Sequence, residues 1–238
     1  MLRSHRLEFW LVVMLSLGAS AIWSVISFLR KLQAAGGLAA STTTINRPLA
    51  ETPWLDLVSQ LASISLGLVP VVLAIYLLSL DAIKIGLLPK PKDLFQVVIV
   101  AAAVGIPGIG LYFLAVELGL SSQVVPSALN TSWWTIPILL LAAMKAGLLE
   151  EVVAVAFFTE KLRKFRPATS TLVIVLASAL FRASYHLYQG YSAFVGNFVM
   201  GIVFAYWYHR TRRVAPLVLA HFLMDAVVFI GYPLVFGS

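Results

Sequence analysis

Seven apolar stretches constrain this chain more than any other feature, because each approaches or exceeds the ~18 residues of a bilayer-spanning helix. Only 11% of the 238 residues are charged, whereas a soluble domain carries roughly a quarter. The stretches are continuous rather than alternating, and this pattern favours helices over strands inside a membrane. We therefore expect an all-α polytopic bundle of about seven transmembrane helices. The stretches cover roughly 8–29, 55–80, 94–117, 133–158, 169–187, 191–209 and 214–233.

The stretches divide the chain into three parts. Residues 1–54 hold a first membrane helix and a long polar loop, and residues 55–132 hold two membrane helices with a basic loop. Residues 133–238 hold four further helices, which we expect to form the functional core. Ala19-Ser20-Ala21 has the small-x-small form of a signal-peptide cleavage site. The apolar run continues to Leu29, however, and this favours an uncleaved signal-anchor helix.

The basic residues lie mainly in the loops between the apolar stretches. Lys and Arg concentrate on the cytoplasmic side of membrane proteins. The distribution therefore predicts a multi-pass cell-membrane protein with a cytoplasmic N-terminus and an external C-terminus. The net charge of +7 is explained by this topology, so we expect no nucleic-acid partner, and the lack of Cys excludes disulfides and thiolate metal sites. The side predicted to be cytoplasmic has Arg3, Arg6, Lys84, Lys90, Lys92, Lys161, Arg163, Lys164, Arg166, Arg210, Arg212 and Arg213, and the other side has Arg30, Lys31 and Arg47.

Polar residues inside the last four stretches are the candidates for function. Ionisable groups are costly inside a membrane and by default indicate a functional site. The adjacent carboxylates of Glu150 and Glu151 are the most costly of them. The full set is Glu150, Glu151, Arg182, His186, Asn197, His221 and Asp225.

The spacing of these residues predicts which of them share a helix face. His221 and Asp225 stand four residues apart, as do Arg182 and His186, and a separation of four places both side chains on one face. Asn197 stands four residues before Gly201, a spacing that suits close packing of helices and favours a structural role for Asn197. A carboxylate can activate water as a general base, and a neutral imidazole can orient that water or stabilise an oxyanion. The same residue types also suit a proton-coupled transporter, so residue types alone leave hydrolase and transporter open.

Three motifs in order resemble those of the CPBP family, the CAAX-protease and bacteriocin-processing (Abi) intramembrane endopeptidases. They are the Glu150-Glu151 pair, the segment around His186, and His221 with Asp225, at intervals of about 35 residues. The resemblance implies an intramembrane metalloprotease or glutamate-dependent protease that cleaves a membrane-associated peptide or protein. By the motif match, Glu150 would be the catalytic base and Glu151 would support it. His186 would hold the water, and His221 and Asp225 would complete the site.

The resemblance leaves the cofactor open. Glu150, His186 and His221 could ligate Zn²⁺ or another divalent metal, although no His-Glu-x-x-His helix is present. A metal-independent mechanism based on Glu and His is the alternative.

Two positions depart from the family's pattern. Four residues after Glu151 the family has Arg, where this chain has Val155, and four residues before His186 it has Phe, where this chain has Arg182. We expect the guanidinium of Arg182 to replace the missing one and to pair with a carboxylate of the Glu pair, with Asn197 as a further supporting residue. The missing motif Arg also leaves open a catalytically silent membrane scaffold or immunity-type partner as the alternative.

Overall fold

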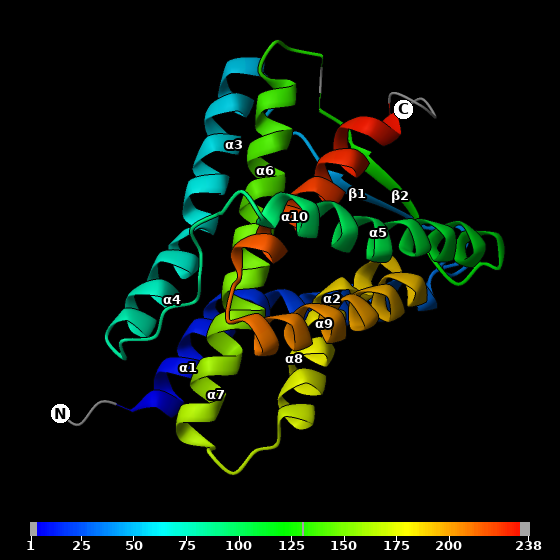
Figure 1. Cartoon of the computed structure of the whole chain (residues 1–238). Helices are drawn as coiled ribbons and strands as arrows, with labels where there is room; N and C mark the ends of the chain where they lie inside the picture. The colour runs from blue at the N-terminus through cyan, green and yellow to red at the C-terminus, as the bar shows by residue number, and fades with distance from the viewer. Residues whose placement is uncertain (1–3, 130, 234–238) are drawn as a thin grey trace.

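A computed structural model describes residues 4–129 and 131–233 of the chain, so Arg3 lies outside the described residues. The chain is mostly helical (Figure 1). The helices are α1 (His5–Val13), α2 (Ala19–Gln33), α3 (Pro53–Gly67), α4 (Val69–Ser79), α5 (Asp93–Glu117), α6 (Thr135–Leu149), α7 (Phe158–Phe165), α8 (Thr171–His186), α9 (Tyr191–Thr211) and α10 (Ala215–Ala226). Wider π-helical turns cover Met14–Gly18, Glu150–Phe157 and Val227–Gly231, and a 3₁₀ turn covers Leu187–Gln189.

Four helical segments of the described chain are long and apolar enough to cross a membrane, so the chain is a multi-pass membrane protein. The structure therefore supports fewer spans than the seven predicted. Residues 133–158 and 191–209 are helical but are not among the four, and Ala215–Gly231 is a shorter apolar helix. The four segments are His5–Gln33, Pro53–Ser79, Asp93–Glu117 and Thr171–Gln189.

A small parallel sheet is present beside the helices, so the predicted all-α bundle is confirmed as mostly helical and not as wholly helical. Strand β1 (Thr42–Asn46) pairs with β2 (Gln123–Ser127), with Thr42 opposite Gln123. β1 lies in the polar part of residues 1–54, which the sequence predicts as a long loop. The Lys31 ammonium at the end of α2 donates to Ser122 Oγ at 2.9 Å, just before β2. The polar part of the first predicted domain is therefore held against the rest of the molecule.

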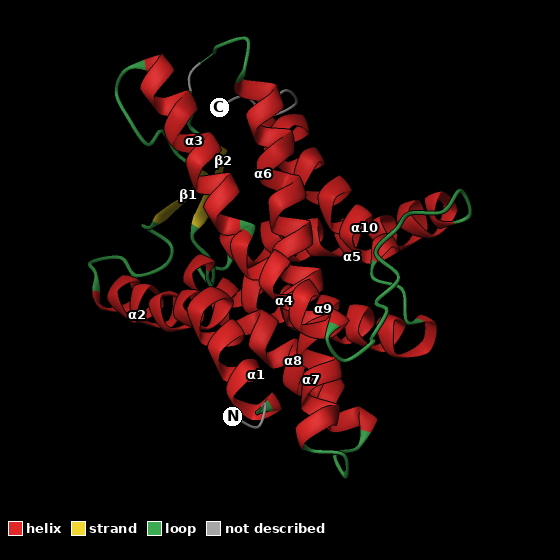
Figure 2. Cartoon of the chain, turned by 90° about the vertical axis from the view of Figure 1, so that its left-hand side faces the viewer, coloured by secondary structure: helices red, strands yellow, loops and turns green. Residues whose placement is uncertain are grey.

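The π-helical segment Glu150–Phe157 lies at the centre of the bundle. It joins α6 to α7, which lie towards opposite ends of the molecule in both overall views (Figures 1 and 2). The side chains from Val152 to Phe157 are fully buried, whereas apolar side chains such as Leu15, Phe95 and Ile106 are well exposed on outer helices. Apolar residues on the outside and polar residues at the centre are the pattern expected of a bundle in lipid.

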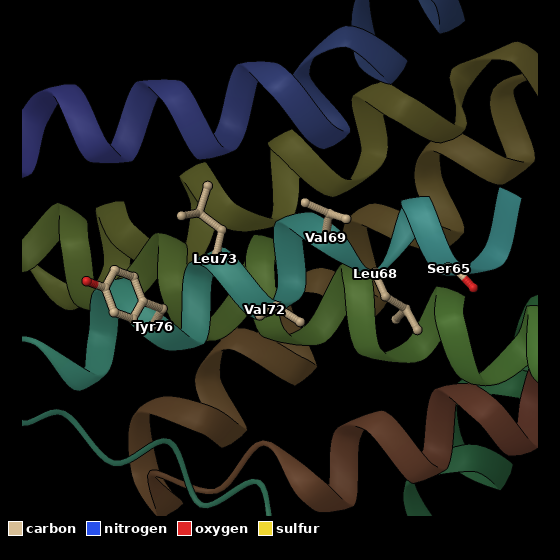
Figure 3. A pocket seen from close by; sticks show the side chains of 6 residues that line it. All are labelled: Ser65, Leu68, Val69, Val72, Leu73 and Tyr76. Carbon is tan, nitrogen blue, oxygen red and sulfur yellow. The ribbon is translucent and has the colours of Figure 1, made fainter. Parts of the chain in front are cut away.

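A shallow apolar groove of about 360 Å³ lies where α3 meets α4 (Figure 3). Its lining includes none of the polar residues singled out in the sequence. The lining residues are Ser65, Leu68, Val69, Val72, Leu73 and Tyr76.

Candidate active site

Helix geometry places the two carboxylates at the start of the central π-helical segment. Glu150 and Glu151 begin the π-helical segment Glu150–Phe157. Backbone hydrogen bonds in a π-helix join residues five apart, whereas those in an α-helix join residues four apart. Such turns insert an extra residue into a helix and occur frequently at functional sites. The local backbone thus departs from α-helix where the two charges are buried.

Two glycines bring the neighbouring helices close to this segment. A Cβ on Gly147 would lie 2.8 Å from the carbonyl oxygen of Val218, so only glycine lets α6 approach α10 this closely. A Cβ on Gly201 would lie 2.7 Å from Cα of Ala179, which brings α9 equally close to α8. The packing role predicted for Gly201 is therefore confirmed.

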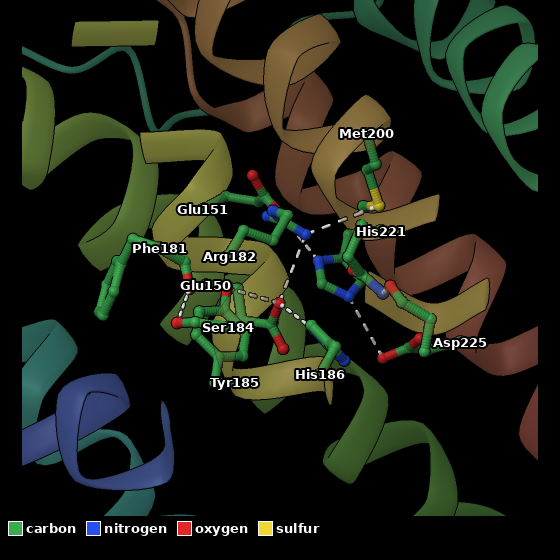
Figure 4. Close-up of polar contacts among 12 residues, drawn as sticks. Glu150, Glu151, Phe181, Arg182, Ser184, Tyr185, His186, Met200, His221 and Asp225 are labelled. Carbon is green, nitrogen blue, oxygen red and sulfur yellow. Dashed lines mark hydrogen bonds and ion pairs between the residues drawn. The ribbon is translucent and has the colours of Figure 1, made fainter. Parts of the chain in front are cut away.

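Arg182 pairs with both carboxylates, as the sequence predicts. Its Nη1 lies 3.3 Å from Glu150 Oε2, and its Nη2 donates to Glu151 Oε1 (Figure 4). The guanidinium is almost completely buried at 1% exposed and also lies 5.5 Å from the ring of Phe204 on α9. Arginine remains protonated in proteins, so this contact supplies one permanent positive charge between two acids.

Glu150 is held through a single oxygen. Its Oε2 accepts from Tyr185 Oη at 3.0 Å and lies 3.2 Å from His186 Nε2, in addition to the Arg182 contact. Its Oε1 makes no hydrogen bond to any side chain that the structure describes. The three partners all lie on α8, so one helix orients this carboxylate.

Glu151 forms the inner part of the site with α10. Its Oε1 lies 2.7 Å from His221 Nδ1, and the other ring nitrogen of His221, Nε2, lies 3.6 Å from Asp225 Oδ2. Glu151 is fully buried and His221 is 5% exposed. Both ring nitrogens of His221 therefore face carboxylates.

The exposed fractions divide the site into an inner and an outer set. The side chains of Glu150, His186 and Asp225 are 11%, 18% and 23% exposed. Those of Glu151 and Arg182 are 0% and 1% exposed. A molecule that enters the site therefore meets the outer set first, and the inner set acts through it.

Six of the seven predicted residues form one connected cluster, and Asn197 lies outside it. The cluster consists of Glu150, Glu151, Arg182, His186, His221 and Asp225. Asn197 donates to the carbonyl oxygen of Ala193 one turn back along α9, at 3.0 Å. Its side chain makes no hydrogen bond to either carboxylate of the Glu pair, whereas Met200 on the same helix has its sulfur 3.6 Å from Arg182 Nη1. The placement of Asn197 gives no support for its predicted role beside Arg182.

Sequence reasoning missed Tyr185 and Met200 as parts of the site. Tyr185 is not among the candidate residues, because an aromatic residue near the end of a predicted membrane helix is typical of the membrane boundary. A signal was present in its position directly before His186 and three residues after Arg182. On a helix, a residue three positions away is a neighbour.

The predicted metal ligands do not come together as a metal site. Within residues 4–129 and 131–233, the three-residue group with ligand atoms within 4.8 Å of one another is His5, Glu8 and Asp81, not the predicted set. His221 has each ring nitrogen facing a carboxylate, and the Arg182 guanidinium already lies between the two glutamates. As arranged here, these side chains pair with one another and do not form a metal-binding set, and metal dependence stays a prediction.

The arrangement as a whole suits acid–base chemistry. Three carboxylic acids face one permanent cation and two imidazoles. Charges buried together in a bundle must be balanced by nearby partners. The two imidazoles lie beside the carboxylates that share this one cation. The set can therefore accept a proton from water and return it within a few ångströms.

Comparison with known proteins bears on this same part of the chain. Residues 132–227 match the family described as type II CAAX prenyl endopeptidase, Rce1-like. No curated protein and no solved structure matches the chain. The matched stretch contains the Glu pair and the site residues of α8 and α10. The resemblance stated from the three motifs is thereby confirmed, and the chain carries over residues 132–227 an Rce1-like domain of the CPBP family.

Proposed function

We propose that this protein is an intramembrane endopeptidase that hydrolyses a peptide bond of a membrane-associated protein or peptide. The observation that supports this best is the fixing of Glu150 through one oxygen. Tyr185, His186 and Arg182 all contact Oε2, so Oε1 is left to accept a proton from water. A candidate general base must be positioned by its neighbours and reachable by water; Glu150 is buried but keeps 8% of its surface exposed, whereas Glu151 keeps none.

The proposed reaction needs only groups that this chain supplies. Glu150 Oε1 takes a proton from water, and the water oxygen forms a bond to the scissile carbonyl carbon. The carbonyl oxygen becomes an oxyanion, which His186 stabilises from the outer set. Glu150 then returns the proton to the leaving amine as the C–N bond breaks. Arg182 keeps Glu150 ionised before the reaction, since a neighbouring positive charge favours the charged carboxylate.

The inner residues would position the others. Glu151 contacts both Arg182 and His221, so it fixes the guanidinium from one side and the imidazole from the other. Asp225 contacts the opposite face of His221 and orients it. A carboxylate is a poor oxyanion donor, so positioning of His221 is the role we assign to Asp225.

The substrate class follows from the family and from the location of the site. The family description refers to CAAX prenyl endopeptidases, whose name implies prenylated peptides. We propose that the substrate reaches the site from the bilayer, in a protein whose N-terminus is cytoplasmic and whose C-terminus is outside.

A test without a known substrate compares protein termini in living cells. Cells that produce the wild-type protein or the Glu150→Gln variant are fractionated, and new N-termini in membrane proteins are identified by mass spectrometry. We expect a set of termini that the wild type produces and the variant loses, with equal amounts of folded protein. Glu117→Gln, at the exposed end of α5, is the matched control and should keep the set. Identical termini with wild type and Glu150→Gln would remove the mechanism.

One sequence feature supports a second function. Val155 stands where the family has Arg, and this departure fits a catalytically silent scaffold or immunity-type partner. In that case the cellular phenotype of a deletion is rescued equally by the wild type and by Glu150→Gln. Rescue by the wild type alone favours the protease.

A further inference from the structure

Helix α10, which carries the last two residues of the candidate site, is capped by a distant part of the chain. The first N–H groups of a helix have no partner within the helix. The N–H of Val214 donates to the carbonyl oxygen of Ile85 at 2.8 Å, and that of Ala215 donates to the carbonyl oxygen of Gly86 at 3.2 Å. Both acceptors lie in the segment between α4 and α5, far earlier in the sequence. The start of α10 is therefore held by residues outside its own part of the sequence.

Gly86 makes this close approach possible. Its φ of +59° lies in the left-handed region, which residues with a side chain rarely adopt. A Cβ on Gly86 would lie 2.9 Å from the carbonyl oxygen of Arg212 and 2.9 Å from Cα of Arg213, in the turn between α9 and α10. A larger residue at this position would push the segment away from the start of α10.

An ion pair fastens the same turn to the start of α5. Arg213 Nη2 lies 2.5 Å from Asp93 Oδ2 and donates to the carbonyl oxygen of Leu88 at 3.2 Å. Asp93 Oδ2 also accepts from the backbone N–H of Lys90 at 2.8 Å. Asp93 is only 1% exposed, so the turn cannot move away without leaving a buried charge uncompensated. We refer to Ile85, Gly86, Asp93 and Arg213 as the α10 clasp.

Helix α5 contacts α10 again at the depth of the site. The two helices lie side by side in both overall views (Figures 1 and 2). A Cβ on Gly105 of α5 would lie 3.3 Å from Cγ of Met224, which stands directly before Asp225. The helix that begins with Asp93 therefore holds α10 at its start and again beside the candidate site.

We propose that the α10 clasp sets the position of His221 and, with it, the inner part of the candidate site. His221 lies about two turns into α10, roughly 10 Å along the axis from the clasp, and its Nδ1 lies 2.7 Å from Glu151 Oε1. A shift or rotation of α10 at its start changes this hydrogen bond. Gly86, Asp93 and Arg213 are then positioning residues. The inference rests on the proposed protease function for its effect on activity, but the placement of His221 is measured without cleavage.

The test uses the chain's four histidines, which give few signals when labelled with ¹⁵N. NMR spectra of the wild type and of Asp93→Asn are recorded in detergent micelles, and His221→Gln identifies the signals of His221. Asp56→Asn is the matched control. Asp56 is also 1% exposed, and it accepts the backbone N–H of Leu49 at 2.7 Å much as Asp93 accepts that of Lys90. Asp56 lies on α3, and its partners lie outside α10.

We expect Asp93→Asn to shift both ring-nitrogen signals of His221. It should also lower the yield of the wild-type protein termini by about tenfold, the effect of weakening one hydrogen bond to a charged group. Asp56→Asn should leave the His221 signals and the termini unchanged, even where its melting temperature falls equally. Arg213→Lys keeps the charge but loses the guanidinium fork, so it should shift the same signals less. It is the second variant where Asp93→Asn does not fold.

Unchanged His221 signals in folded Asp93→Asn or in Arg213→Lys would overturn the proposal, as would equal shifts with Asp56→Asn. Shifted His221 signals in a protein that produces no termini would support the clasp and count against the protease function alone. The two failures are therefore distinguishable.

Discussion

Replacing Arg182 with Met is the most direct test of how the site is held together. The guanidinium is 1% exposed and contacts one carboxylate that is fully buried and another that is 8% exposed. Removing one partner of a buried ion pair costs about 3–5 kcal/mol, because the remaining charge is left without compensation. A domain of this size loses about 2–4 °C of melting temperature per kcal/mol. The Arg182→Met variant should therefore melt roughly 6–20 °C below the wild type.

The measurement is thermal unfolding of the purified protein in detergent, followed by the fluorescence of its six tryptophans. Arg210→Met is the matched control, since Arg210 is exposed on α9 and should change the melting temperature little. Adding Glu151→Gln to Arg182→Met should recover part of the loss, because one of the two uncompensated charges is then gone. A melting temperature for Arg182→Met equal to that of the control would refute the reasoning.

The same argument predicts the effect of moving the guanidinium. The double variant Val155→Arg/Arg182→Phe restores the family's order of residues and places the cation on the helix of the Glu pair. Val155 is fully buried in the segment that begins with that pair. We expect the double variant to be more stable than Arg182→Phe alone, with a coupling of about 1–3 kcal/mol between the two positions. Additive losses would show that position 155 does not face the carboxylates.

Two further substitutions test individual contacts. Tyr185→Phe removes the hydroxyl that donates to Glu150 at 3.0 Å. We expect the yield of the wild-type protein termini to fall by about tenfold. The melting temperature should show a loss of about 1 kcal/mol in the free energy of unfolding. Gly201→Ala places a methyl 2.7 Å from Cα of Ala179, so it should destabilise by about 1–3 kcal/mol. Gly108→Ala, whose Cβ would meet nothing within 4 Å, should be neutral or slightly stabilising, and equal effects of the two alanines would contradict the packing argument.

The membrane helices could be predicted because apolar length is a local property. Four predicted spans correspond to long apolar helices in the structure. The stretch 133–158 is helical but carries Lys145, Glu150 and Glu151, so it departs from a uniform span. Local composition thus identifies helices well and identifies spans less well where a helix carries functional charge.

The sheet could not be predicted because its pairing is not local. β1 and β2 are about 80 residues apart, and each is only five residues long. Thr42, Thr43 and Thr44 are a weak strand signal, since β-branched residues favour strands. A single short strand has no partner in its own segment, so a Thr-rich stretch beside Gly and Ser gives a loop as the better local prediction.

The depth of His186 shows the limit of estimates from helix length. Counting 1.5 Å per residue along an upright helix places His186 about 25 Å from Thr169, and the other site residues roughly 10–16 Å from their helix ends. The structure nevertheless places His186 Nε2 3.2 Å from Glu150 Oε2. The count assumes parallel helices with ends at one surface. The spacing of four between Arg182 and His186 makes no such assumption: it predicts a shared helix face, and in the structure both side chains contact Glu150.

This chain has Val155 where the family has Arg, and Arg182 where the family has Phe. These two differences bear on whether the family's chemistry is available to this chain. The physical requirement is a cation between two buried carboxylates, and it matters less which helix provides that cation. Here α8 supplies the cation, and the same helix supplies Tyr185 and His186 to the same oxygen of Glu150. Movement of α8 therefore changes the charge balance and the orientation of Glu150 together. Because one helix here holds both roles, activity should be more sensitive to substitutions that shift α8, such as those at Gly201, which packs against Ala179, than to equally destabilising substitutions elsewhere.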